Sequence, residues 1–444
     1  MQLRPEAERL RTQSDACAAT LARIRRRLLP FTFLLYIAAY LDRINVGFAA
    51  LRMNHDLGLG DAAFGLGAGL FFIGYFLFEI PSNLILERVG ARAWIARIMI
   101  SWGVLAMATA AVRSASSFYV LRFLLGAAEA GFFPGIILYL TYWFPPREQA
   151  RAIALFMTAS ALAGVIGGPL SGALLGTDGM LGLAGWQWLF ILEGLPSVLL
   201  GVGVWFNLPD GPRDARWLSA EEKLLLAQSL AREAARGREQ TLIGGLTGAR
   251  VWLMALLYFA IVTGLYGVTM WLPQIVKGLG ALDNLEVGLV SAVPFLAAAV
   301  TMVAVGQSSD RRGERRWHLA LSAFAGAGGL ILCARAHHTM FALAALSLAA
   351  AGIWGTMGPF WSIPSDYLGG TAAAAGIALI NSVGNLGGFA GPYLVGMARQ
   401  RSHDFNGALT ALAMTLAAAG CLALAIARSR PSRPAEPVKF RAGR

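Results

Sequence analysis

The sequence predicts an all-α membrane protein whose twelve transmembrane helices form two pseudo-symmetric six-helix bundles. Three observations lead to this prediction: the chain is 57% hydrophobic and only 14% charged, its apolar runs are long enough to cross a bilayer, and its two halves repeat a motif pattern. An ordinary soluble domain is about 45–50% apolar and about a quarter charged. So much apolar surface requires lipid as its solvent.

A spanning helix needs about 20 mostly apolar residues. The runs that meet this length lie at 28–50, 62–86, 93–112, 117–143, 149–175, 187–207, 251–275, 285–307, 317–335, 340–364, 372–398 and 406–427. One long polar stretch separates the sixth run from the seventh. We therefore expect an N-terminal segment (1–27), a first bundle (28–207), a cytoplasmic linker (208–250), a second bundle (251–427) and a tail (428–444).

The placement of basic residues predicts the orientation of the chain in the membrane. Of the 37 Lys and Arg residues, 29 lie in segments on the side of the two termini and six lie on the opposite side. Cytoplasmic loops carry such an excess of positive charge. Both termini are therefore expected in the cytoplasm. The same placement, in short segments between apolar runs, argues against a nucleic-acid partner and for a lipid bilayer.

The two halves repeat at an offset of 223 residues. The acidic-basic turn at 87–90 recurs at 310–313, and the glycine-proline patch at 164–169 recurs at 387–392. Parallel repeats of six helices are a recurrent plan of secondary transporters, whose substrate site lies between the repeats near the midplane of the bilayer.

The repeated acidic-basic turns are candidates for a gate. Their carboxylates can pair with arginines or favour a nearby helix N-terminus, which makes a latch that holds in one state and parts in another. The alternative is that these charges only set the topology. The residues concerned are Glu87, Arg88, Gly90 and Arg92 in the first half and Asp310, Arg311, Gly313, Arg315 and Arg316 in the second.

Ionisable residues within the spanning helices are the sharpest functional signal, because each is costly unless it faces protein or water. The equivalent depths of the second half contain none. We therefore expect charge recognition and proton coupling in the first half, with neutral groups shaping specificity in the second. The first-half residues are Asp42, Arg43, Glu79, Arg122, Glu129 and Glu193.

Helix geometry suggests how some of these charges meet. At about 1.5 Å of rise per residue, Asp42 and Arg122 fall at one depth, which predicts a pair. Arg43 is turned about 100° from Asp42 and can point at a central cavity. A carboxylate that exchanges an arginine for a proton is a workable coupling device. The alternative is a static ion-pair network, and we interpret Glu79 and Glu193 as structural.

Polar and aromatic residues are candidates for the wall of that cavity. Aromatics in membrane helices are otherwise packing or interface residues, and this alternative stays open for each of them. The candidates are Tyr40 and Tyr75 in the first half and Tyr258, Tyr266, Trp271, Trp361, Ser362, Asn381 and Asn385 in the second.

Other classes of function lack their signatures in this sequence. Its three cysteines are scattered and its five histidines fall in or beside connecting segments, so we expect no metal and no cofactor. A phosphate-binding GxxxxGK[ST] motif is missing, which argues against direct ATP drive. An enzyme would show a nucleophile with a base, and a membrane sensor would add a signalling domain.

Five motifs give the chain, from about 25 to 428, a resemblance to the anion:cation symporter family of the major facilitator superfamily. They are DRINVGFAA at 42–50, PSNLILERVGAR at 81–92, RFLLGAAEAGFFPG at 122–135, WQWLFILEGLP at 186–196 and GQSSDRRGERR at 306–316. In the second motif, Asn83 stands where the superfamily often has glycine.

The resemblance implies proton-driven uptake of an organic acid such as a sugar acid, tartrate, or a phthalate- or hydroxyphenylacetate-like anion. It implies protonation at Asp42 and Glu129 and neutralisation of a substrate carboxylate by Arg43, with Arg122 as a second candidate. Tyr40, Tyr75, Trp361, Ser362 and Asn385 match the family's cavity positions loosely. Bacterial members lie in the inner membrane, and we expect a monomer. The alternative function is a proton-antiport exporter, which the two buried arginines disfavour.

Overall fold

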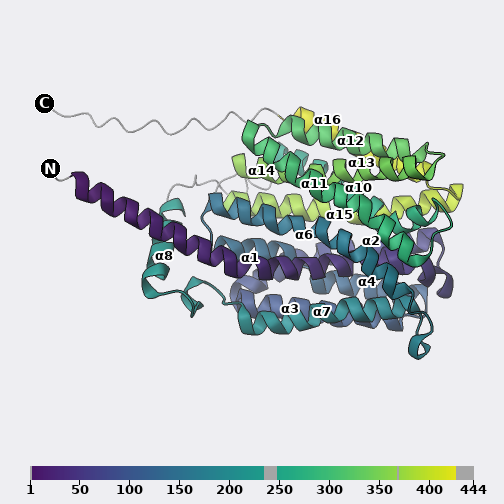
Figure 1. The fold of residues 1–444 in the computed structure, drawn as a ribbon, viewed down its shortest axis with the longest axis horizontal. Helices are drawn as coiled ribbons and strands as arrows, with labels where there is room; N and C mark the ends of the chain where they lie inside the picture. Colours follow the sequence, from purple (N-terminus) through teal and green to yellow (C-terminus); the bar gives the residue numbers. More distant parts are fainter. Residues whose placement is uncertain (1–2, 235–247, 368–369, 427–444) are drawn as a thin grey trace.

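The computed structural model describes residues 3–234, 248–367 and 370–426, which form helices and connecting turns without a β-strand. The first group of helices comprises α1 (Leu3–Asp56), α2 (Asp61–Val89), α3 (Ala91–Ala108), α4 (Ala115–Glu129), α5 (Phe132–Thr141), α6 (Pro146–Leu175) and α7 (Gly185–Asn207). Helix α8 (Ala220–Ala234) follows. The second group comprises α10 (Ala249–Lys277), α11 (Asn284–Arg312), α12 (Arg316–Ala334), α13 (Thr339–Gly355), α14 (Met357–Tyr367), α15 (Gly370–Ser402) and α16 (Asn406–Ala425). The two groups lie side by side (Figure 1).

The described residues contain 11 segments that are long and apolar enough to cross a membrane. The twelfth expected span, 372–398, lies in α15 and is not one of the 11. Its glycines and asparagines make it less apolar, but it packs between α2 and α10 and therefore presents less surface to lipid. The all-α membrane fold is confirmed.

Two expected spans are each broken into two helices, at corresponding places in the two halves. The span 117–143 breaks at Gly131, where φ is +84°, between α4 and α5. A side chain there would be strained and would also collide with Ser82. The span 340–364 breaks at Thr356, between α13 and α14.

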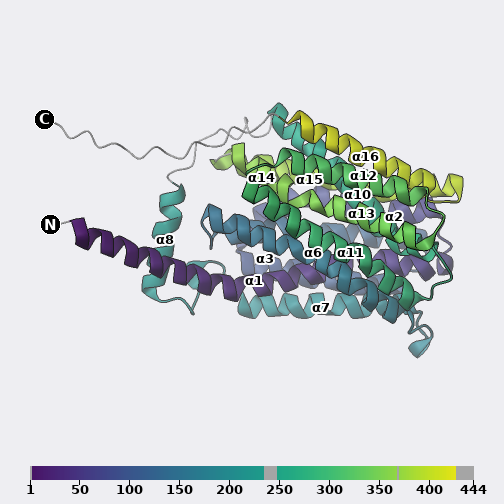
Figure 2. The ribbon, with the colours of Figure 1, turned by 45° about the horizontal axis from the view of Figure 1, so that its top comes forward.

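Helix α1 continues without interruption from the N-terminal segment into the first span and is 54 residues long. Its first part and α8 extend beyond the same end of the bundle (Figures 1 and 2). We call this the α8 end and the opposite one the far end. Helix α8 begins at a capping box, in which the Glu222 N–H donates to the Ser219 hydroxyl at 3.1 Å and the Ser219 N–H donates to the Glu222 carboxylate at 2.9 Å.

The residues before α8 dock against the first group of helices. The Trp217 ring stacks on Trp143, with centroids 5.7 Å apart. The Arg27 guanidinium lies 5.3 Å from the Trp217 centroid, and Arg23 pairs with Glu222 at 2.9 Å. The polar stretch is thereby tied to the α8 end of α1.

The two groups of helices touch backbone to backbone toward the far end. A Cβ added at Gly65 of α2 would lie 2.5 Å from the Pro392 carbonyl oxygen of α15. A Cβ added at Gly168 of α6 would lie 2.5 Å from the carbonyl oxygen of Gly288 in α11, and Gly288 is the repeat equivalent of Gly65. Small residues let helices approach this closely. The far end is therefore closed by two seams that the internal repeat relates.

Polar contacts reinforce the seams. Asp61 of α2 pairs with Arg399 of α15 at 3.0 Å, and the Ala62 N–H donates to the Gln400 side-chain oxygen at 3.0 Å. Arg399 also donates to the Gln274 side chain at 2.6 Å. The far end thus joins the two halves by charge as well as by packing.

Candidate functional site

A small chamber of about 50 Å³ lies between the two groups of helices, away from the far-end seams. This volume holds only a few water molecules, so the halves are closed around it. Arg43 is the only charged residue in its wall, among the described residues. The wall also includes Tyr36, Tyr40, Tyr75, Ser160, Tyr258, Tyr266, Trp354, Asn381 and Asn385.

Arg43 of the first half forms a hydrogen bond to the second half. Its guanidinium donates to the Tyr266 hydroxyl of α10 at 2.7 Å. Tyr266 follows Arg43 by 223 residues, which is the offset of the internal repeat. Two equivalent positions, one from each half, are therefore in contact across the interface. The guanidinium carbon also lies 5.3 Å, 5.6 Å and 5.9 Å from the ring centroids of Phe71, Tyr75 and Tyr266. Aromatic faces stabilise such a cation where water is scarce.

The negative partner of Arg43 is Glu129 of α4, and the two form a buried ion pair within the first half. A guanidinium recognises carboxylates through hydrogen bonds that carry charge. A carboxylate entering the chamber can therefore compete with Glu129 for Arg43. This places Arg43 and Glu129, two predicted site residues, in one unit.

Asp42 points away from the chamber, although it is adjacent to Arg43. Its carboxylate accepts hydrogen bonds from the Trp102 indole at 2.7 Å and the Ser197 hydroxyl at 2.5 Å. The turn of about 100° per residue along a helix explains why Arg43 faces α4 while Asp42 faces α3 and α7. The pair of Asp42 with Arg122 that depth suggested is wrong in this structure.

Arg122 is buried between α2 and α4 rather than in the chamber wall. It donates one hydrogen bond, of 3.4 Å, to the Ala68 carbonyl, and its guanidinium carbon lies 5.0 Å from the Phe71 ring centroid. Its Nε and Nη1 atoms have no hydrogen-bond partner among the residues of 3–234, 248–367 and 370–426. Arg122 and Arg43 thus lie against the same aromatic ring, and Arg43 is the only ion-pair partner that Glu129 has among the described residues.

The remaining predicted cavity residues divide into two groups. Tyr40, Tyr75 and Asn385 line the chamber. Trp361 instead packs against Tyr258, with centroids 5.0 Å apart, and the Ser362 hydroxyl donates to the Gly358 carbonyl in its own helix at 3.0 Å. Both lie in α14, beyond the break in the span, and neither is part of the described wall.

Tyr36 is a wall residue that the sequence analysis missed. It stacks on Phe156, with centroids 4.4 Å apart. The signal was present, because Tyr36, Tyr40 and Arg43 follow each other at intervals of four and three residues and therefore share one face of a helix.

Glu79 and Glu193 are both buried and both have neutral partners. Glu79 of α2 accepts hydrogen bonds across the interface from the Asn381 amide and, at 3.0 Å, from the Ser382 hydroxyl of α15. Glu193 accepts one from Ser171 at 2.7 Å within the first half. Glu79 therefore contacts a chamber residue, Asn381, and joins the two halves.

The acidic-basic turn of the first half, at 87–92, which we call the first loop motif, contacts residues of its own half. Gly90 has a φ of +98°, which favours glycine. The Arg92 N–H donates to the Asp210 carboxylate at 2.9 Å, and the Arg92 guanidinium lies 3.7 Å from it. Asp210, which the sequence analysis missed because it lies after the sixth span, is the acidic partner here. Glu87 and Arg88 are exposed and form no described ion pair.

The acidic-basic turn of the second half, at 310–315, which we call the second loop motif, also forms its contacts within its own half. Asp310 pairs with Arg315, which also donates to the Ser309 hydroxyl at 3.1 Å. Gly313 ends the helix in the left-handed conformation, with φ of +60°, and Arg311 is exposed. Among the described residues, no ion pair joins one loop motif to the other half.

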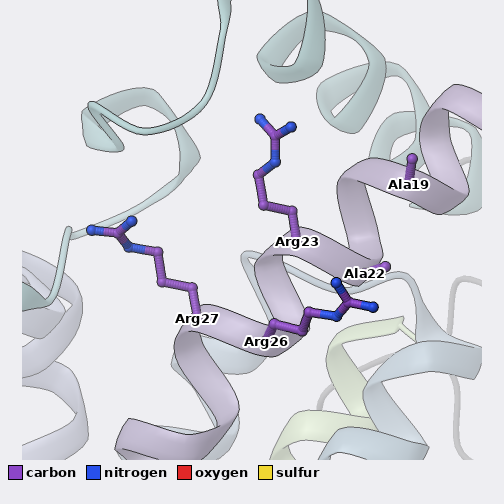
Figure 3. A pocket seen from close by; sticks show the side chains of 5 residues that line it. All are labelled: Ala19, Ala22, Arg23, Arg26 and Arg27. Atoms are coloured by element: carbon purple, nitrogen blue, oxygen red, sulfur yellow. The ribbon is translucent and has the colours of Figure 1, made fainter.

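A second hollow lies on the surface of α1 at the α8 end. It measures about 620 Å³ and is lined by Ala19, Ala22, Arg23, Arg26 and Arg27. Its arginine side chains spread apart (Figure 3), and Arg23 and Arg27 are engaged with Glu222 and Trp217. The enclosed chamber at Arg43 is therefore the candidate site. The described residues contain no group of three or more His, Cys, Asp or Glu placed to hold a metal ion.

Comparisons with known proteins agree with this geometry. Residues 32–392 match the Major Facilitator Superfamily. An Agrobacterium vitis protein named "Putative tartrate transporter" is 50% identical over 420 residues, which cover 94% of this chain and 93% of that protein. The "Quinolone resistance transporter" of Acinetobacter baumannii is 42% identical over 393 residues, which cover 88% of this chain and 91% of that protein.

A structure of the xylose transporter XylE from E. coli, in a partially occluded inward-open conformation, shares the fold. Its TM-score is 0.75 at 14% identity, and the match covers 92% of this chain and 99% of that chain. The chain is therefore a multi-pass membrane transporter rather than an enzyme. It belongs to the Major Facilitator Superfamily, which confirms the family resemblance of its motifs.

Proposed function

We propose that the protein is a proton-coupled symporter that takes up a small organic carboxylate by alternating access of its two halves. The observation that carries this proposal is the position of Arg43. It is the charged residue of the described chamber wall, it pairs with Glu129 of its own half, and it donates a hydrogen bond to neutral Tyr266 of the other half.

Coupling follows from the exchange of partners at Arg43. When the substrate carboxylate binds the guanidinium, Glu129 loses its counter-charge. A carboxylate without a counter-charge is costly in an interior that excludes water, so Glu129 takes up a proton. Release of the substrate restores the pair with Arg43 and expels the proton. Binding of the anion and of the proton are then linked through one arginine.

We assign Asp42 a second proton, held behind the chamber by neutral donors. Its hydrogen bonds to Trp102 on α3 and Ser197 on α7 connect the protonation state of α1 to the packing of the first half. Arg122 adds positive charge near the Glu129 side of the chamber without contacting the wall. Tyr40, Tyr75 and Asn385 would contact the bound anion through the wall they form.

The orientation follows from the basic residues, 29 of which the sequence assigns to segments on the side of the two termini, and the described part of the N-terminal segment and α8 lie at the α8 end. We assign this end to the cytoplasm and the far end to the outside of an inner (plasma) membrane. The closed far-end seams then correspond to a conformation sealed against the outside. In the outward-open state the loop motifs at 87–92 and 310–315 would latch the cytoplasmic end.

Tartrate is the first substrate to test, because a relative 50% identical bears its name. Quinolones also carry a carboxylate, so the 42% identical resistance transporter is compatible with the same arginine but suggests export. The rival function is therefore proton antiport of a carboxylate drug.

Transport into liposomes separates the two functions. Purified protein should accumulate labelled L-tartrate when the outside is acidic, and Arg43→Gln should abolish this accumulation. Tartrate uptake that ignores an imposed pH gradient would contradict symport. Accumulation of norfloxacin driven by an acidic interior, without tartrate uptake, would establish the antiporter instead.

A further inference from the structure

Asp42 and Glu193 are two acids buried in the first half, with 2% and 3% of their surfaces exposed. They come from α1 and α7, and both lie outside the chamber wall. Each has one carboxylate oxygen that accepts hydrogen bonds: Trp102 and Ser197 donate to Asp42, and Ser171 donates to Glu193. The other oxygens, Oδ1 of Asp42 and Oε2 of Glu193, have no hydrogen-bond partner in the described part of the chain.

Asn45 supplies two further unpartnered atoms in the same cluster. It lies one helical turn after Asp42 on the same face of α1, and none of its surface is exposed. Its amide oxygen and its amide nitrogen both lack a hydrogen bond to any residue that the structure describes. Its side chain lies close enough to Glu193 to interact with that carboxylate, and Asp42 lies within electrostatic range of Glu193. Buried polar groups almost always find partners, so four unpartnered atoms in one cluster require an explanation.

One proton accounts for all four atoms. A proton on Oδ1 turns the Asp42 carboxyl into a donor, and the Asn45 amide oxygen is an acceptor within the cluster. The Asn45 amide nitrogen is then oriented as a donor toward Oε2 of Glu193. The chain of donors and acceptors is complete only if one carboxyl is protonated and the other is not.

The charges around the cluster favour the same arrangement. The donors that contact the two acids from α3, α6 and α7 are Trp102, Ser171 and Ser197, which are neutral. The other charged group that acts on Asp42 is Glu129, which is also acidic. Two like charges in a buried cluster with neutral donors cannot both persist, so one carboxyl holds a proton.

We propose that Asp42, Asn45 and Glu193 form one proton-sharing unit, in which Asn45 bridges the two carboxyls and Glu193 helps to set the proton affinity of Asp42. The inference deepens the proposed function, on which the assignment of a transported proton to Asp42 rests. Glu193 and Asn45 are then positioning residues for proton coupling, instead of structural residues only.

Infrared difference spectroscopy of the purified protein can test the unit without a substrate. The carbonyl stretch of a protonated carboxyl is followed as pH is changed, and the band that Asp42→Asn removes belongs to Asp42. In Glu193→Gln, loss of the neighbouring negative charge should lower the proton affinity of Asp42 about tenfold, a shift of about one pH unit. Asn45→Leu should shift the midpoint in the same direction and leave both carboxyls in place.

Glu79→Gln is the matched control, because Glu79 is an equally buried acid with partners on α15. It should leave the Asp42 band unmoved. An unchanged Asp42 midpoint in both Glu193→Gln and Asn45→Leu would overturn the proposal. So would loss of the band on replacing choline by sodium at constant pH, because the cluster would then hold a cation. If Glu193→Gln does not fold, Asn45→Leu decides alone.

This result is separable from the proposed function. A protein that shows the coupled titration but no proton-driven tartrate uptake would retain the proton-sharing unit and lose the symport proposal. Gradient-driven uptake of tartrate by a protein in which the two carboxyls titrate independently would retain the symport proposal and overturn the proton-sharing unit.

Discussion

The two halves of the transporter share one fold but divide the chemistry unequally. Among the described residues, all the buried charged side chains belong to the first half: Asp42, Arg43, Glu79, Arg122, Glu129 and Glu193. The polar residues of the second half that the structure describes as buried are neutral, and include Asn381, Ser382 and Asn385. The position of Arg43 in the first half is occupied by Tyr266 in the second.

This difference has a mechanical consequence. Around the chamber, the hydrogen bonds between described residues that cross from one half to the other join a charged group to a neutral one, as in Arg43 with Tyr266 and Glu79 with Ser382. The Arg43–Glu129 pair lies within one half. Parting a hydrogen bond to a neutral group costs less than leaving a buried charge without its counter-charge. The halves can therefore separate at the chamber without breaking an ion pair.

The largest expected effect is a loss of stability when the Arg43–Glu129 ion pair of the first half is broken. Arg43→Leu leaves Glu129 buried without its counter-charge and should destabilise the protein by about 3–5 kcal/mol. The double variant Arg43→Leu/Glu129→Gln should recover most of this stability but no transport. Unfolding monitored by a thermal shift gives the comparison. A single variant as stable as the double variant would show that the pair contributes little.

Replacing Asp42 tests whether the second carboxyl of the first half couples transport to protons. Asp42→Asn should reduce gradient-driven accumulation of tartrate at least about tenfold, because a permanently neutral side chain cannot bind and release a proton. Exchange of internal for external tartrate, which needs no net proton movement, should continue. Full concentrative uptake by this variant would remove Asp42 from the coupling mechanism.

A substitution in the far-end seams changes the packing between the halves and leaves their charges as they are. Gly168→Leu places a side chain against the Gly288 carbonyl and should disfavour closure by about 1–3 kcal/mol, since overpacked contacts cost this much. We expect slower transport and faster labelling of a cysteine at buried Ser291. Gly328→Leu, where an added Cβ meets nothing within 4 Å, is the matched control. Unchanged labelling in Gly168→Leu would contradict the seam as a gate.

The smallest effect, a modest loss of tartrate affinity, is expected from a change at Tyr266, the neutral partner of Arg43. Tyr266→Phe removes one hydrogen bond from Arg43, a loss of about 1 kcal/mol or about fivefold in tartrate affinity. Isothermal titration of the purified protein measures this change. Tyr119→Phe, which removes a hydroxyl outside the chamber wall, is the control. A loss as large as that caused by Arg43→Gln would mean that the second half recognises the anion directly.

The sequence was enough to predict the helices, the internal repeat and the residues that carry charge at membrane depth. These predictions depend on length, periodicity and the cost of burying a charge, which act locally along the chain. The separation of Asp42 from Arg43 was also predictable, because neighbouring residues on a helix face different directions.

The partners of these charges could not be predicted in the same way. Depth along a helix axis places Asp42 level with Arg122 but does not give the rotation of each helix or the identity of its neighbours. Arg43 therefore pairs with Glu129, which sequence spacing did not indicate. Trp361 likewise packs against Tyr258, a contact that spacing along the chain did not indicate. Asp210 reaches Arg92 only through the path of a connecting segment.

The central claim is that an anion displaces Glu129 from Arg43 and that Glu129 then takes up a proton. Adding L-tartrate to the purified protein in weakly buffered solution measures this directly. We predict uptake of about one proton per anion from this site in the wild type, an affinity that rises up to about tenfold for each unit fall in pH, and the loss of that proton in Glu129→Gln. Tartrate binding without proton uptake, or equal uptake in Glu129→Gln, would contradict the claim.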